Sequence, residues 1–146
     1  MANDMMTKLG SWAFIIGIII ALIFGIWQAA TYEAALNDAT KVNDIFFLTD
    51  NGGYVAWLLA ALGAIVGILA FLGKGTITSK EVPGFLLAGI ALVVMGGVFP
   101  GIVGMYQLQP WIGSLLAGVS ISLAIFVAPA VGILSIKAVW DMGKDV

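Results

Sequence analysis

Four long segments of this chain contain almost no charge, and they limit its fold more than any other feature. A helix needs roughly 20 mostly apolar residues to cross the hydrocarbon core of a bilayer. Because the apolar runs are long and do not alternate with polar residues, they predict helices and not barrel strands. We therefore expect an all-α fold, a single integral membrane domain over residues 1–146 in which four transmembrane helices form a bundle. The predicted spans are Ser11–Ala30, Tyr54–Leu72, Val82–Met105 and Ile112–Ala138.

The side chains that most enzymes use are missing from the composition. Hydrophobic residues make up 62% of the chain and charged residues 10%, against about 25% charged residues in soluble domains. The chain has no Cys and no His, which excludes thiol nucleophiles, disulfides and most metal and haem ligation. Its six basic residues are all lysines and its net charge is −2, so nucleic acid is not an expected partner. We predict a protein that is not an enzyme and that holds no cofactor or metal.

The distribution of lysines predicts how the chain is oriented in the membrane. If the chain crosses four times, Lys41 lies on one side, in a loop with four carboxylates, and the other five lysines lie on the opposite side. Loops on the cytoplasmic side carry the excess of basic residues. We therefore expect a multi-pass plasma-membrane protein with both termini in the cytoplasm. The five lysines on that side are Lys8, Lys74, Lys80, Lys137 and Lys144.

The tryptophans agree with these boundaries. Amphipathic aromatic rings favour the headgroup level of a bilayer. Trp12 and Trp140 are predicted as anchors at the inner interface, and Trp27, Trp57 and Trp111 as anchors at the outer interface.

The loop Thr31–Gly53 is the one sizeable segment outside the predicted spans. Its apolar residues recur at helical spacing, which predicts a short amphipathic outer helix lying on the membrane or on a neighbouring subunit. The sequence Asn51-Gly52-Gly53 is a turn signal that predicts a break before the second span.

Small residues recur at every fourth position of the first span, where they leave one helix face without large side chains. In a membrane, helices associate through close packing, and small residues mark their interfaces. Two interpretations stay open, because such a face can pack inside the bundle or against another protomer. The predicted packing and oligomer-interface residues are Ala13, Gly17, Ala21, Gly25 and Ala29 in the first span and Gly63 and Gly67 in the second. Further small-residue series are Gly97, Gly101 and Gly104 in the third span and Ala117, Ala124, Ala128 and Gly132 in the fourth.

Serines and prolines interrupt the later spans. Ser114, Ser120 and Ser122 are candidates for lining a pore, although serines in membrane helices also bond to a local carbonyl or a neighbouring helix. Pro100 is expected to end the third span, and Pro129 to kink or tilt the long fourth span.

The last two spans resemble a group of small four-span membrane proteins of archaea. The segments that carry the resemblance are "TSKEVPGFLLAGIALVVMGG" and "IFVAPAVGILSIKAVWDM". The resemblance implies an archaeal plasma membrane and brings no functional residues with it.

These features predict a non-enzymatic structural membrane protein that self-associates laterally, as an oligomer or an extended array, through its small-residue helix faces. Two alternatives stay open. One is a pore or channel subunit whose serines in the fourth span face a lumen. The other is an accessory subunit that packs against other membrane proteins in a hetero-complex. The lipid bilayer is an expected partner in all three cases.

Overall fold

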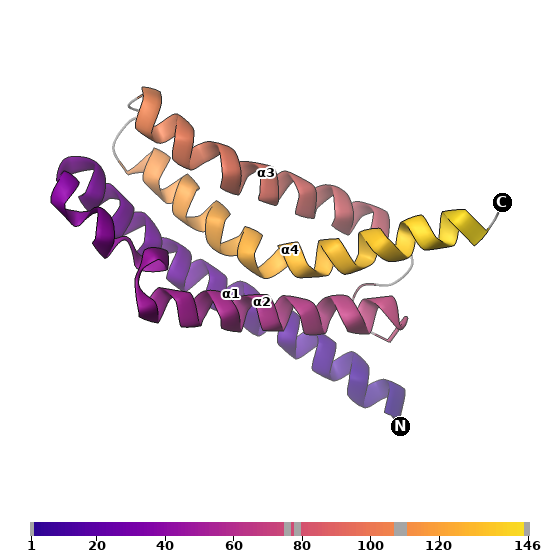
Figure 1. The fold of residues 1–146 in the computed structure, drawn as a ribbon. Coiled ribbons are helices and arrows are strands. Elements are labelled where there is room, and N and C mark those ends of the chain that lie inside the picture. Colours follow the sequence, from indigo (N-terminus) through magenta and orange to yellow (C-terminus); the bar gives the residue numbers. More distant parts are fainter. Residues whose placement is uncertain (1, 75–76, 78–79, 107–110, 145–146) are drawn as a thin grey trace.

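Four α-helices and two short 3-10 helices make up the fold (Figure 1). The computed structural model describes residues 2–74, 77, 80–106 and 111–144, and at 2–3, 36, 39, 42 and 99–106 it describes the backbone alone. The described ranges contain no strand, so the prediction of an all-α fold is confirmed. The elements are α1 (Ala2–Asn37), η1 (Ala39–Asp44), η2 (Phe46–Leu48), α2 (Asp50–Phe71), α3 (Val82–Tyr106) and α4 (Ile112–Lys144).

Three of these helices are long and apolar enough to cross a membrane, which indicates a membrane protein. They are α1 over Asp4–Ala35, α2, and α4. In α3 the stretch with described side chains, Val82–Val98, is apolar but shorter. A helix suits this environment because it satisfies its own backbone hydrogen bonds where no water is present.

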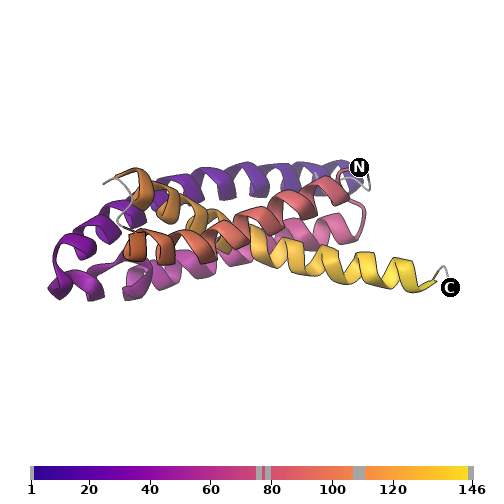
Figure 2. The ribbon, with the colours of Figure 1, turned by 90° about the horizontal axis from the view of Figure 1, so that it is seen from above.

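Helix α4 lies in the middle of the bundle. It packs against α1, α2 and α3, whereas α3 packs mainly on α4 (Figures 1 and 2). The chain runs up and down, so α1 begins and α4 ends at the same end of the molecule (Figure 1). The central position of α4 decides which of the predicted site residues are accessible.

The core is thin, and the outer surface is apolar. Phe126, Leu59 and Leu134 are almost completely buried between the helices. Large apolar side chains such as Trp57 and Leu87 are 78% and 74% exposed. In a membrane, lipid would solvate such side chains as well as a core does, so the bundle would be held by close helix packing and not by expulsion of apolar surface from water.

The two prolines behave differently. Helix α4 changes direction near its middle (Figures 1 and 2), and Pro129 lies within it. Proline removes one backbone donor and pushes its ring against the preceding turn, which bends a helix. This agrees with the predicted kink. Helix α3 continues through Pro100 to Tyr106, so the expectation that Pro100 ends the third span is wrong.

The predicted amphipathic outer helix does not form. Helix α1 continues to Asn37, and η1 and η2 follow it as two short 3-10 helices. They pack on the ends of α1 and α2. Ile45 and Phe46 are 9% and 8% exposed, so these apolar side chains of the loop pack against other residues of the same chain. The segment is therefore a cap on the bundle and not a helix lying on the membrane.

The predicted break before the second span is also corrected. Asn51, Gly52 and Gly53 form the first turn of α2, and Thr49 caps it by accepting a hydrogen bond of 3.1 Å from the Gly52 amide. A Cβ atom at Gly52 would lie 1.7 Å from the Phe46 carbonyl oxygen. This glycine is required because η2 passes close to the helix, and not because the chain turns there.

Candidate functional site

The small-residue series of α1 forms a seam against α4. Ala13, Ala21 and Ala29 are at most 6% exposed, and Gly17 and Gly25 are buried. A Cβ atom at Gly17 would lie 2.1 Å from the ring of Phe126. The glycine therefore provides the space that the Phe126 ring occupies.

The backbones of α1 and α4 meet further along this seam. A Cβ atom at Gly25 would lie 2.9 Å from the Cα atom of Val119 and 3.3 Å from the carbonyl oxygen of Gly118. A distance below 3.0 Å to a backbone atom cannot be relieved by rotating a side chain. The two helices can approach this closely because the seam lacks side chains.

The small residues of α2 face the same central helix. A Cβ atom at Gly63 would lie 1.8 Å from the Phe126 carbonyl oxygen, and one at Gly67 would lie 2.7 Å from the Cα atom of Ala130. Helices α1 and α2 thus both present small residues to the neighbourhood of Phe126. This arrangement explains why α4 can occupy the centre of the bundle.

All seven predicted interface residues are therefore used within one chain. The structure buries all seven inside the bundle, where a second copy of the protein cannot reach them while the bundle is closed. The four glycines and Ala29 lie against α4. A surface for self-association has to lie on another face. The periodicity of the sequence marked a packing face correctly, but it contained no signal for which partner would occupy that face.

The three candidate pore serines are also covered by other helices of the chain. Ser114, Ser120 and Ser122 are 2%, 3% and 0% exposed. The Ser114 hydroxyl donates a hydrogen bond to the carboxylate of Glu33 on α1. The Ser122 hydroxyl has no hydrogen-bond partner among the residues that the structure describes. These serines face α1 and α3, so a lumen lined by them would have to open inside the bundle.

Two polar residues near the end of the first predicted span have a role that the sequence analysis missed. Gln28 is 4% exposed, and its Oε1 atom accepts a hydrogen bond of 2.9 Å from the Phe47 amide. The Thr31 hydroxyl accepts one of 3.0 Å from the Phe46 amide. These bonds tie η2 to the end of α1. The sequence feature that could have indicated this role is the polar residue Gln28, which directly follows Trp27 at the edge of an apolar run.

Aromatic rings complete this attachment of η2. The centroid of the Phe46 ring lies 5.2 Å from that of Phe24 and 5.6 Å from that of Trp27. Such pairs add to the free energy gained from burial alone. The end of the bundle opposite the termini is thus closed by a rigid polar and aromatic cap.

The five predicted membrane anchors all lie on the surface. Their exposed fractions run from 57% for Trp27 to 78% for Trp57. Trp140 is in the last turns of α4, at the end with both termini, and Trp111 immediately precedes α4 at the other end. Anchors need this exposure, since their rings must contact lipid headgroups.

Among the small-residue series predicted in the fourth span, one pair stays open. Ala128 and Gly132 on α4 are both exposed, and a Cβ atom at Gly132 would meet nothing within 4 Å. On α3, Gly97 is also exposed with open space around it. Gly101 and Gly104 lie outside the residues whose packing the structure describes. The pair on α4 is one turn apart, so it forms a flat patch on the central helix.

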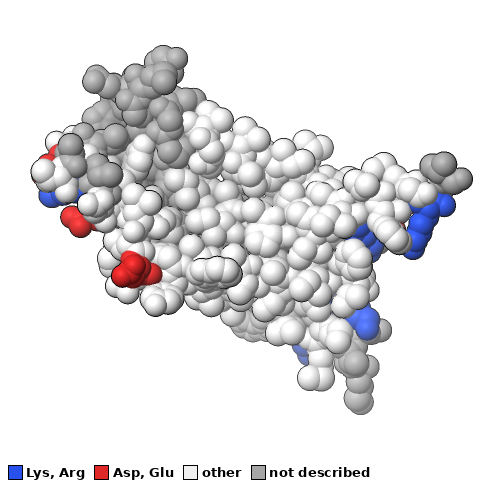
Figure 3. Space-filling model, in the orientation of Figure 1, with Lys and Arg blue, Asp and Glu red and all other residues white. Residues whose placement is uncertain are grey.

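Lysines are unequally distributed between the two ends of the molecule (Figure 3). The end with the termini carries Lys8, Lys74, Lys80, Lys137 and Lys144, together with the acidic residues Asp4, Glu81 and Asp141, whereas the end with the cap carries Lys41 and four acidic residues. Within the described ranges, no group of three or more carboxylates is close enough to hold a metal ion. Hydrogen bonds from Thr40 lower the pKa of the Asp38 carboxyl in the cap. The excess of lysines at one end suits the two faces of a membrane.

Comparison with known proteins adds no family. The chain matches no protein family, no curated protein and no solved structure. The interpretation of function therefore depends on the surfaces described above.

Proposed function

We propose that this chain is a non-enzymatic structural membrane protein whose copies associate laterally through the open face of α4. The observation that carries the proposal is the pair Ala128 and Gly132. It is a small-residue patch that no described side chain of the other helices covers.

The small residues buried inside the bundle are explained by packing within the chain, because they let α1 and α2 approach α4. Packing within the chain does not explain the glycine at position 132, since this position has room for a side chain. A glycine in a helix costs roughly 0.5–1 kcal/mol relative to alanine. A close contact with a helix of another copy explains why this position lacks a side chain.

The proposed location is the plasma membrane, with both termini in the cytoplasm. The support is the gathering of lysines at the end that carries the termini, together with the positive-inside rule. The resemblance of the last two spans to small archaeal four-span proteins supports the same location.

The test is the copy number of the assembly, measured by native mass spectrometry after gentle extraction with lipid retained. Gly132→Leu should lower the copy number without lowering the helical content or the unfolding midpoint, because a Cβ atom at this position would meet nothing within 4 Å and a helical glycine is itself unfavourable. Gly97→Leu is the matched control, since it adds the same side chain at another open position, and it should leave the copy number unchanged.

Three results would count against the proposal. They are a wild-type monomer, an assembly that Gly132→Leu leaves intact, and equal disruption by Gly97→Leu. Unrelated chains in the purified complex would favour the accessory-subunit alternative. A closed ring that conducts ions in liposomes would favour the pore alternative.

A further inference from the structure

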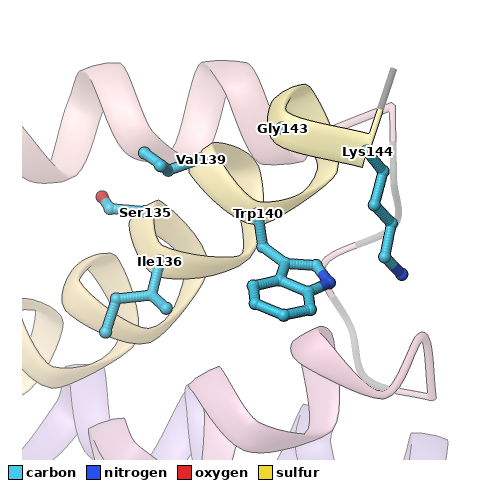
Figure 4. A pocket seen from close by; sticks show the side chains of 6 residues that line it. All are labelled: Ser135, Ile136, Val139, Trp140, Gly143 and Lys144. Carbon is cyan, nitrogen blue, oxygen red and sulfur yellow. The ribbon is translucent and has the colours of Figure 1, made fainter. Parts of the chain in front are cut away.

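The last turns of α4 carry an apolar surface that the other helices leave bare. Ile136, Val139 and Trp140 are 68%, 66% and 65% exposed. Together with their neighbours they line a shallow depression of about 640 Å³ (Figure 4). Its six lining residues are Ser135, Ile136, Val139, Trp140, Gly143 and Lys144.

The depression combines an apolar floor with a basic rim. The Lys144 Nζ atom lies 5.8 Å from the centroid of the Trp140 ring, and the two side chains extend on the same side of the helix (Figure 4). Lys137, one further turn back, is engaged elsewhere, because its Nζ atom donates a hydrogen bond of 2.8 Å to the Phe71 carbonyl oxygen. Lys144 is therefore the lysine of α4 that remains available to a ligand.

The length of α4 places this surface at the edge of the bilayer. Its 33 residues correspond to about 50 Å of helix, against roughly 30 Å for the hydrocarbon core. The last turns therefore extend toward the headgroups. They also lie beyond the bend in α4, where the helix leaves the rest of the bundle (Figure 2).

We propose that this depression binds one anionic lipid of the membrane leaflet at the lysine-rich end of the protein. The phosphate of the lipid pairs with the Lys144 ammonium group, and the upper part of an acyl chain lies against Ile136, Val139 and the Trp140 ring. The argument for this occupant is charge complementarity, because among the described residues this end carries five lysines against three acidic residues, whereas the opposite end carries one lysine against four (Figure 3). Asp141, which is exposed on the same turns, weakens the attraction. The proposal rests on the membrane location given above, but not on self-association.

The test uses the full chain in nanodiscs that contain equal amounts of phosphatidylglycerol and phosphatidylcholine. Native mass spectrometry then counts the lipids of each kind that stay bound to the released protein. Lys144→Ala should lower the retention of phosphatidylglycerol about fivefold, the factor that corresponds to about 1 kcal/mol per lysine near an anionic surface. Phosphatidylcholine retention should not change. Asp141→Asn should raise phosphatidylglycerol retention, because it removes the neighbouring negative charge.

The matched control is Lys41→Ala, which removes a lysine from the opposite end and should have no effect. Lys144→Arg should keep the wild-type retention. Equal phosphatidylglycerol retention in Lys144→Ala and the wild type would overturn the proposal, as would an equal loss in Lys41→Ala. Since Lys144→Ala should leave the copy number of the assembly unchanged, failure here can be distinguished from failure of the proposed self-association.

Discussion

Gly118 of α4 lies directly against Gly25 of α1, so that a Cβ atom at Gly118 would sit 2.5 Å from the Gly25 carbonyl oxygen. The same atom would lie 2.6 Å from the backbone nitrogen of Ala29. Both neighbours are backbone atoms of a continuous helix, which cannot move aside individually. The contact between the first and the last helix of the chain therefore depends on a missing side chain.

Gly118→Ala is expected to lower the free energy of unfolding by about 1–3 kcal/mol, the usual cost of inserting atoms into a well-packed interface. Gly97→Ala is the control. Its new Cβ atom would meet nothing within 4 Å, so it should stabilise α3 by roughly 0.5–1 kcal/mol. Reversible unfolding in detergent micelles measures both variants. Equal stability of the two proteins would mean that α1 and α4 do not approach each other in this way.

The buried serines should respond in opposite directions. Ser122→Ala removes a buried hydroxyl that has no partner in the described part of the chain, so the protein should become slightly more stable or stay unchanged. Ser114→Ala deprives the Glu33 carboxylate of a hydrogen bond, and should cost about 1–3 kcal/mol. The same unfolding measurement compares them. A large loss for Ser122→Ala would show that its hydroxyl has a partner that this packing does not contain.

Gln28→Leu should loosen the cap at the end of the bundle. Without the Oε1 atom the Phe47 amide loses its acceptor, and a buried unpaired donor costs about 1–3 kcal/mol. Hydrogen exchange should show faster exchange at residues 45–49 and little change in α4. Asn43→Leu, at an exposed position of the same loop, serves as the control and should leave the exchange at 45–49 unaltered. Unchanged protection in Gln28→Leu would contradict the assigned role of Gln28.

Thr40→Val should raise the pKa of the Asp38 carboxyl toward its ordinary value. In the wild type, the Thr40 hydroxyl and amide donate to Asp38 at 2.7 and 3.0 Å, and these bonds lower the pKa by stabilising the carboxylate. Because the folded pKa is the lower one, the contribution to stability is complete at neutral pH and is lost as the pH falls through that lowered value. An NMR titration of the Asp38 carboxyl measures the shift. An identical pKa in both proteins would exclude the Thr40 hydroxyl as its cause.

Much of the architecture could be predicted from residue types alone. Apolar runs of 19–27 residues with at most one charge have one stable form in lipid, the helix, because it satisfies every backbone group internally. The helices cover the predicted segments except Leu72, which follows the end of α2, and three of them extend well beyond the predicted bounds, as α1 does in reaching Asn37. The unequal distribution of lysines was equally visible, since it requires no more than the order of spans along the chain.

The loop between α1 and α2 was harder to predict, because its apolar residues fit two structures. Helical spacing suggested an amphipathic helix. Instead, the backbone amides of Phe46 and Phe47 donate hydrogen bonds to the side chains of Thr31 and Gln28. Those hydrogen bonds join residues 15 and 19 positions apart, and no local pattern encodes such a contact. The same holds for Gly52, whose close neighbour is the Phe46 carbonyl oxygen.

Residue types and their order predict apolar helices with small-residue faces and with most lysines at one end. The folded chain was needed to show that α4 occupies the centre, that Gly17 and Gly25 pack against it, and that Gly132 stays open. The reason is that these helices are apolar on all sides. In a soluble protein the polar face of a helix indicates which side meets the solvent. When the solvent is lipid, that indication is lost, and close packing between particular backbones determines which helices lie against each other.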